Sequence, residues 1–154
     1  MRAAPQNGAM KDATPPTDIG ALLARTRTIA VVGLSPSPHR TSYGVSQYMK
    51  ARGFRIVPVN PNTREVFGEK AYPTLREAAK HEKIDLVNVF RQAEDVPPVM
   101  DEAIAIGAPA LWMQLGIINQ AAAAKGRAAG LKVVQDHCIM VEHSRLTRGA
   151  TPWR

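Results

Sequence analysis

The sequence predicts an α/β domain built on a mostly parallel sheet of five or six strands. Segments with the periodicity of strands alternate with segments with the periodicity of helices, from about residue 18 to residue 146. The runs Ile29 to Val32 and Leu86 to Phe90 are almost wholly apolar, which is typical of strands covered on both faces. A chain of 154 residues accommodates one such domain. We therefore expect a Rossmann-like three-layer fold, with helices on both faces of the sheet.

Caps and glycines mark the element boundaries in the first half of the chain. Thr17 is expected to cap a short helix, Gly33 to end the first strand, and Gly53 to end the second helix. In chain order, we expect a helix over 18–25, a strand over 28–32, a loop over 34–41, a helix over 42–52, and a strand over 54–59 that stops at Asn60-Pro61-Asn62.

The second half continues the alternation. A loop with Phe67-Gly68-Glu69 and a short extended piece near 71–72 are expected to precede a helix that Pro73-Thr74 starts. The remaining elements are a strand over 86–90, a helix over 95–106 with two prolines in its first turn, a strand over 110–115, a helix from Asn119 to 129, a strand over 131–135 and a short helix around 139–143. We expect one domain over 18–146, with a flexible N-terminal tail over 1–17 and a C-terminal tail over 147–154.

The composition favours a cytoplasmic protein that binds a polyanionic small molecule. The formal net charge is +7, but the basic residues are scattered and only 5% of residues are aromatic, which disfavours nucleic acid as a partner. The apolar runs are too short to span a membrane, and residues 1–17 lack the apolar core of a secretory signal. The single cysteine, Cys138, excludes an internal disulfide, which suits a reducing cytosol.

The loop after the first strand is the strongest candidate for a phosphate site. Ligands of open parallel sheets bind outside the carboxyl ends of the strands. Here Ser42, Tyr43 and Gly44 lie at a predicted helix N-terminus, where free N–H groups and the helix dipole favour an anion. Arg40 adds a planar cation suited to phosphate. Further donors in this loop are Ser35, Ser37, His39 and Thr41.

The loop does not match the common nucleotide fingerprints. It contains neither G-x-G-x-x-G nor the Gly-Lys-Ser/Thr of a Walker loop. An NAD site usually carries an acidic residue at the end of the second strand, but this strand ends at Val59-Asn60-Pro61 and Arg64 follows. These features disfavour NAD, while an NADP site and other phosphorylated nucleotides remain compatible with the sequence.

Six segments together resemble a known family. They read GLSPSPHRTSYGVSQYM, VPVNP, FGEKAYPTL, NVFR, LWMQLGI and DHCIMVEH. In these segments the chain resembles the small bacterial and archaeal CoA-binding domain proteins, which are similar to the CoA-binding domain of the succinyl-CoA synthetase alpha subunit. The resemblance covers about residues 18–146. It implies a Rossmann-like fold that binds coenzyme A at the strand ends.

The resemblance also implies a set of binding residues. Those expected at the phosphates are Gly33, Ser35, Arg40, Ser42 and Tyr43. Those expected to border the nucleotide are Val59, Asn60 and Pro61. Phe90 and Arg91 are expected to face the adenine or ribose region, and Gln114 and Gly116 to lie beside the pantetheine path. The synthetase carries a phosphorylated histidine on a second domain and works with a beta subunit. Since this chain has neither, the resemblance does not extend to ligase activity.

No residue pattern points to catalysis or to a metal. Cys138 and His143 could form a nucleophile pair, but a spacing of five residues is awkward on a helix, and a buried inert thiol is the commoner fate of a lone cysteine. His137, Cys138 and His143 lack the paired spacing of a zinc site. Three hypotheses follow: a non-catalytic module that binds coenzyme A or acyl-CoA, an enzyme acting on an acyl-CoA thioester, and an NADP-dependent oxidoreductase. We favour the first.

Overall fold

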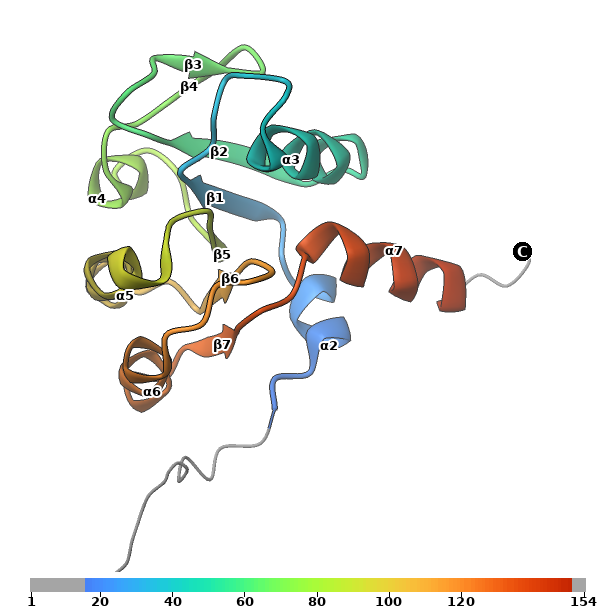
Figure 1. Ribbon diagram of the computed structural model, residues 1–154, viewed down its shortest axis with the longest axis vertical. Helices are drawn as coiled ribbons and strands as arrows, with labels where there is room; N and C mark the ends of the chain where they lie inside the picture. Colours follow the sequence, from blue (N-terminus) through green and yellow to red (C-terminus); the bar gives the residue numbers. More distant parts are fainter. Residues whose placement is uncertain (1–15, 151–154) are drawn as a thin grey trace, which may run out of the picture.

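A computed structural model describes residues 16–150 and contains a five-stranded parallel sheet (Figure 1). The strand order is β2-β1-β5-β6-β7, and every neighbouring pair is parallel. The strands are β1 (Thr28–Val32), β2 (Arg55–Val59), β5 (Leu86–Val89), β6 (Ala110–Met113) and β7 (Lys132–Val134). This arrangement confirms the predicted α/β Rossmann-like fold.

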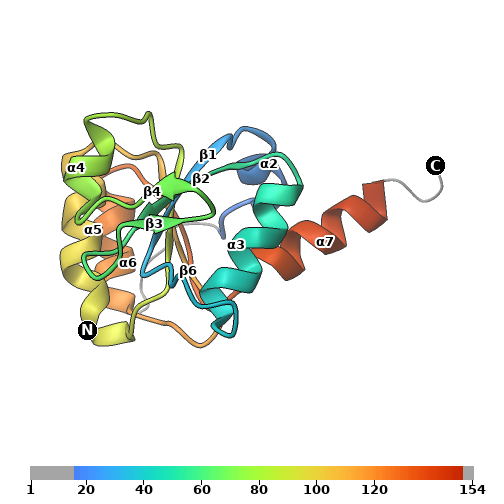
Figure 2. The same ribbon diagram turned by 90° about the horizontal axis from the view of Figure 1, so that it is seen from above.

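Helices cover both faces of the sheet (Figures 1 and 2). One layer contains α2 (Ile19–Ala24), α3 (Thr41–Ala51) and α7 (Ile139–Ala150), and the other contains α4 (Leu75–Ala79), α5 (Val96–Ala105) and α6 (Gln120–Ala128). A hydrophobic core lies on each face of the sheet, and β1 contributes side chains to both, because successive residues of a strand point to opposite faces. Ile29 and Val31 pack in one core, and Ala30 and Val32 pack in the other. The near-continuous apolar run of β1 therefore follows from burial on both sides.

The carboxyl ends of β2, β1 and β5 lie level with one another. Val32 at the end of β1 pairs with Val59 of β2 on one side and with Val89 of β5 on the other. The chain passes from β1 to β2 on one side and later returns to β5 on the opposite side, so the topological switch lies between β1 and β5. The loops that leave these strands meet at this point of the carboxyl edge, where ligands of such sheets bind.

A small hairpin was absent from the sequence prediction. Strands β3 (Glu65–Val66) and β4 (Glu69–Lys70) pair antiparallel around Phe67-Gly68, where we expected a loop. Both turn residues have positive φ, 58° and 73°, as a tight hairpin turn requires. The Phe67 ring packs against Tyr43 with 4.6 Å between centroids. The extended piece expected near 71–72 exists, and its Tyr72 forms a parallel bridge with Val59.

Several element boundaries differ from prediction. Asp18, not Thr17, caps α2: its carboxylate accepts a hydrogen bond from Ala21 N, whereas the Thr17 hydroxyl donates to Val133 O at the other edge of the sheet. A 3₁₀ turn, η1 (Ala93–Asp95), precedes α5. Helix α7 continues through Ala150, past the C-terminal domain boundary that we expected at residue 146.

Residues 1–15 of the predicted N-terminal tail and 151–154 of the predicted C-terminal tail lie outside the described residues. Within residues 16–150, no helix has both the length and the apolar character needed to span a bilayer.

Candidate functional site

A cavity of about 820 Å³ opens at the carboxyl edge of the sheet, beside the switch point. The loop after β1 and the start of α3 supply one wall: Gly33, Ser35, His39, Arg40, Thr41 and Ser42. The segment after β5 supplies the opposite wall: Phe90, Arg91, Gln92 and Asp95. Ile117, from the loop between β6 and α6, completes the lining. The volume is in the range of sites that enclose a cofactor-sized molecule.

Internal hydrogen bonds hold the loop after β1 in one shape. Ser35 N donates to the Ser42 hydroxyl at 3.0 Å, which ties the beginning of the loop to the first turn of α3. Ser37 N donates to the Ser35 hydroxyl, also at 3.0 Å. The buried Asn60 amide donates to Leu34 O at 2.9 Å and so joins this loop to the end of β2. Because both serine hydroxyls accept these bonds, each keeps its own hydrogen to donate to a ligand.

Gly33 allows the chain to leave β1 close to the end of β5. Its φ is +89°, a region that residues with a side chain rarely adopt. A Cβ at this position would lie 2.3 Å from Phe90 O, which is far inside van der Waals contact. Glycine is therefore needed here for two reasons: the backbone has a positive φ, and the two loops that form the cavity approach too closely for a Cβ.

Positive charge reaches the cavity from both walls. Arg40 and Arg91 line it from different loops, and neither guanidinium forms an ion pair with a carboxylate among the described residues. Arg40 is also the N-cap residue of α3, and its side chain does not cap the helix. The positive end of the α3 dipole therefore points toward the same space as two guanidinium groups. This combination suits a ligand with more than one phosphate.

Half of the residues predicted for the site line the cavity. These are Gly33, Ser35, Arg40, Ser42, Phe90 and Arg91. The others lie outside its lining. Tyr43 packs against Phe67, Val59 is buried in the core, and Pro61 is exposed beyond β2.

The three remaining predicted residues use polar groups to hold the structure. Asn60 joins two loops, as described above, and its Oδ1 accepts a bond from Asn62 N at 2.9 Å. Gln114 is buried and donates to Asn88 Oδ1 at 2.7 Å. Gly116 N donates to the Asp136 carboxylate at 2.7 Å. These side-chain and backbone groups position the strand ends around the cavity.

Three lining residues were missed by the sequence reasoning. Asp95 looks like a helix cap in the sequence, but its side chain makes no capping bond to α5 and faces the cavity instead. Gln92 and Ile117 follow β5 and β6 within a few residues, which is the only signal that could have identified them.

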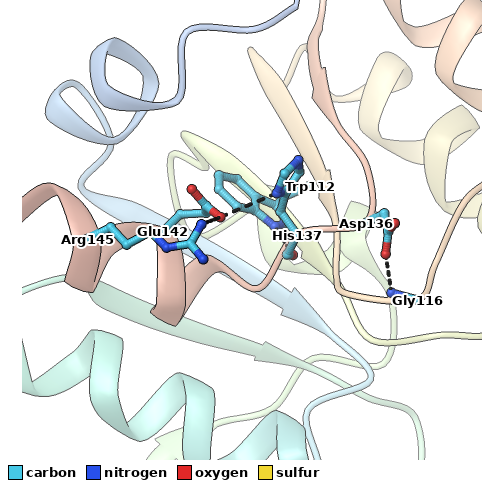
Figure 3. A network of polar contacts seen from close by, with 6 residues as sticks. All are labelled: Trp112, Gly116, Asp136, His137, Glu142 and Arg145. Atoms are coloured by element: carbon cyan, nitrogen blue, oxygen red, sulfur yellow. Dashed lines mark hydrogen bonds and ion pairs between the residues drawn. The ribbon is translucent and has the colours of Figure 1, made fainter.

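A polar network lies beside the cavity, at the ends of β6 and β7 (Figure 3). Trp112 Nε1 donates to His137 O at 2.7 Å, and His137 Nδ1 lies 3.3 Å from the Glu142 carboxylate. Arg145 approaches the same carboxylate at 3.2 Å. Asp136 has φ +60° and accepts the bond from Gly116 N. The network fixes the start of α7 and the loop after β6.

Cys138 and His143, the residues considered for chemistry, do not lie together on the cavity lining. Cys138 is half-buried and packs against the core beneath α7, and the His143 ring contacts Tyr48 and Phe54. Burial and the nearby Arg52 cation lower the pKa of His143. Within the described part of the chain, no group of three His, Cys, Asp or Glu side chains could hold a metal ion.

The family comparison agrees with this arrangement. The CoA binding domain family matches residues 27–144, which include every strand of the sheet and the whole cavity lining. The chain belongs to this CoA-binding domain family. The match confirms the resemblance seen in the sequence segments.

Relatives of this CoA-binding domain protein include small proteins and one segment of a larger enzyme. The protein YneT of Bacillus subtilis is 42% identical over 127 residues, 82% of this chain and 93% of YneT. A structure of a hypothetical protein from Pyrococcus horikoshii is 34% identical, with a TM-score of 0.82 over 92% of this chain and 99% of that one. An ADP-forming acetate–CoA ligase of Archaeoglobus fulgidus is 29% identical over 83 residues, which are 53% of this chain but 12% of the ligase.

Proposed function

We propose that the cavity at the carboxyl edge binds coenzyme A or an acyl-CoA, and that the protein acts as a binding or regulatory module without chemistry of its own. The observation that carries this proposal is the pair of guanidinium groups, Arg40 and Arg91, that face one cavity from two loops without a carboxylate partner among the described residues. Coenzyme A carries about four negative charges on its pyrophosphate and 3′-phosphate.

The prepared shape of the loop supports the proposal. Backbone N–H groups that are already held in place lose little conformational entropy when they bind a phosphate. Ser35 and Ser42 are fixed by the bonds at 3.0 Å described above, and Asn60 anchors the loop from the neighbouring strand. A nucleotide with several phosphates then meets donors from both walls at once. The family of this chain and its ligase relative favour coenzyme A among such nucleotides.

The absence of a catalytic role is part of the proposal and rests on how the candidate groups are engaged. The Asp136 carboxylate holds the Gly116 amide, and Glu142 lies between His137 and Arg145. Among the described residues of the cavity lining, Asp95 is the one carboxylate and His39 the one histidine. No hydrogen bond joins His39 to Asp95 or to a serine hydroxyl in this part of the chain, so the lining holds no assembled pair of nucleophile and base.

The first test is isothermal titration calorimetry with coenzyme A on the full chain. We expect Arg40→Ala to weaken binding at least about tenfold, which corresponds to ~1.4 kcal/mol, because a charge-assisted bond to phosphate is lost. We expect Arg91→Ala to act in the same direction. Arg76→Ala is the matched control, since Arg76 lies on α4 and pairs at 3.7 Å with Glu102. Unchanged affinity in both Arg40→Ala and Arg91→Ala would remove the cavity from consideration.

The second test separates coenzyme A from NADP. A ligand present at about 100 times its dissociation constant adds ~2.7 kcal/mol to the stability of the folded state, which a thermal-shift assay detects. We expect a shift with coenzyme A and acetyl-CoA and none with NADPH at the same concentration. A shift with NADPH alone would contradict the proposal. Incubation of acetyl-CoA with the protein should leave the thioester intact, and measured hydrolysis would refute the non-catalytic role.

A further inference from the structure

The loop between β6 and α6 exposes apolar side chains on either side of a cavity-lining residue. Leu115 is 69% exposed and Ile118 is 47% exposed, and these are two of the four large hydrophobic side chains that are exposed in the described part of the chain. Ile117, between them in sequence, lines the cavity itself. Two exposed apolar side chains therefore flank, in sequence, an apolar residue of the cationic cavity. Exposed apolar groups gathered in one place usually mark a binding site.

Hydrogen bonds at both ends hold this loop firmly. Ile117 N donates to Gln114 O at 2.9 Å and Gly116 N donates to the Asp136 carboxylate at 2.7 Å. At the far end, Asn119 Nδ2 donates to Ala93 O at 2.9 Å, which ties the loop to the segment that carries Asp95 (residues 90–95). The backbone N–H groups of Gly116 and Ile117 have partners while the side chains of Leu115 and Ile118 remain exposed to solvent. Their exposure therefore does not come from a frayed end.

The rest of the cavity indicates what covers this apolar surface. Arg40 and Arg91, from opposite walls, and the α3 N-terminus bring positive charge to the cavity, and Phe90 and Ile117 are apolar members of the same lining. A ligand that matches both kinds of group carries phosphates and an aliphatic group. Free coenzyme A ends in a thiol, whereas its thioesters carry an acyl chain beyond that sulfur.

We infer that the loop of Leu115, Ile117 and Ile118 binds the aliphatic acyl chain of a CoA thioester, so that the protein selects medium-chain acyl-CoA over free coenzyme A. This inference rests on the proposed function, since it requires the phosphates of the same ligand to be bound by Arg40 and Arg91. Burial of one methylene contributes up to about fourfold in affinity. We therefore expect octanoyl-CoA, with six methylenes more than acetyl-CoA, to bind at least about tenfold more tightly even with partial burial.

The experiment is a calorimetric series of coenzyme A, acetyl-CoA, butyryl-CoA and octanoyl-CoA on the full chain. Affinity should rise with chain length in the wild type. In the double variant Leu115→Ser/Ile118→Ser, most of the rise in affinity with chain length should be lost, and only the part contributed by Ile117 should remain. The matched control is Val141→Ser/Leu146→Ser, which removes the other exposed apolar pair, on α7, where the side chains are 39% and 40% exposed. This control should keep the full dependence on chain length.

The free coenzyme A titration distinguishes the two levels of the argument. Equal affinity for all four ligands would overturn the acyl-chain inference and leave the proposed function standing. Failure of every ligand to bind would overturn the proposed function, and the inference with it. A chain-length dependence that persists undiminished in the Leu115→Ser/Ile118→Ser variant would place the acyl chain elsewhere and overturn the inference. Light scattering tests whether a second copy of the chain covers this loop instead. A wild-type dimer that becomes monomeric in Leu115→Ser/Ile118→Ser, with no dependence of affinity on chain length, would make the loop a contact between copies and overturn the inference.

Discussion

The two edges of the sheet use charged residues in opposite ways. At the amino edge, the Asp85 carboxylate accepts hydrogen bonds from Arg27 N and Thr28 N, both at 3.0 Å, just where β1 begins. Beside it, the Arg55 guanidinium at the start of β2 forms two bonds with Glu82, at 2.8 and 2.6 Å. Each of these charges has its partner within the chain. They act on the fold and leave no charge free for a ligand.

The cavity at the carboxyl edge keeps charges and apolar groups available, although Asp136 and Glu142 beyond its lining have partners within the chain. Arg40 and Arg91 face the cavity without a carboxylate partner among the described residues, and Asp95 does not cap its helix. The loop of Leu115 and Ile118 exposes apolar surface on the same edge. Unpaired charge and exposed apolar surface add nothing to the stability of the free protein. Under the proposed function, the carboxyl edge is assigned to ligand binding, whereas the paired charges at the amino edge stabilise the fold.

The largest expected effect comes from a methyl group at Gly33, where the carboxyl edge is most crowded. Gly33→Ala places a Cβ 2.3 Å from Phe90 O at φ +89°. We expect it to lower the free energy of unfolding by about 2–5 kcal/mol, since backbone strain and overpacking each cost roughly 1–3 kcal/mol. Urea unfolding measures the loss.

Gly53→Ala at the amino edge is the matched control for this change. Gly53 has φ +99° and no atom within 4 Å of a built Cβ, so the substitution carries the strain without the clash. We expect a loss of about 1–2 kcal/mol. Equal losses in the two variants would show that the approach of β1 to Phe90 is not tightly constrained.

The next largest effect is expected from Asp85 at the amino edge. Asp85→Ala leaves Arg27 N and Thr28 N without their acceptor, and loss of bonds to a charged group costs about 1–3 kcal/mol. Asp85→Asn keeps one acceptor oxygen and should recover part of this. We expect the affinity for coenzyme A to be the same as in the wild type for both variants. A tenfold loss of affinity would show that the two edges are not independent.

At the carboxyl edge, the sequence predicted the features that lie within one segment better than the contacts between segments far apart in the chain. The alternation of apolar runs and helices gives the strand ends, and the loop from Gly33 to Ser42 carries its donors within ten residues. Nothing local shows that Asn60 bonds to Leu34 O, or that Asp95 faces the cavity, because these placements depend on packing between distant segments. The Phe67-Gly68 hairpin was missed since phenylalanine is unfavourable at positive φ, and the packing of its ring against Tyr43 joins distant segments of the sequence.

Replacing one arginine at each edge by alanine tests the contrast between the two edges with smaller expected changes in stability. Arg55→Ala removes a guanidinium that is 46% exposed and pairs with Glu82 and Glu69. We expect it to lower the free energy of unfolding by about 0.5–1 kcal/mol without changing the affinity for coenzyme A. Arg40→Ala should do the reverse, with weaker binding and nearly unchanged stability. The free energy of unfolding and the affinity for coenzyme A should be measured on both variants. If either variant changed both quantities substantially, the contrast between the two edges would be wrong.

The smallest expected effect is a pH dependence from His143, which packs on the half of α3 nearest the amino edge. Its Nδ1 lies 3.1 Å from the Tyr48 hydroxyl, the ring contacts Phe54, and the Arg52 guanidinium lies over the Tyr48 ring. Burial first, and then the Arg52 charge, lower the pKa of His143 from its ordinary value of 6.5. The unfolded chain therefore binds this proton at a higher pH than the folded chain does.

The sign of the pH effect follows from that order of protonation. Above pH 6.5 the histidine is neutral in both states, and as the pH falls through 6.5 the unfolded state gains the proton first. The free energy of unfolding should decline between about pH 7.5 and pH 5.5, before the carboxylates protonate. His143→Gln should flatten this decline, whereas the control His81→Gln, an exposed histidine stacked on Tyr72, should not. If the free energy of unfolding of His143→Gln depended on pH as steeply as that of the wild type, protonation of His143 would not be the cause of the decline. The contact between α7 and α3 would then tolerate the charged ring.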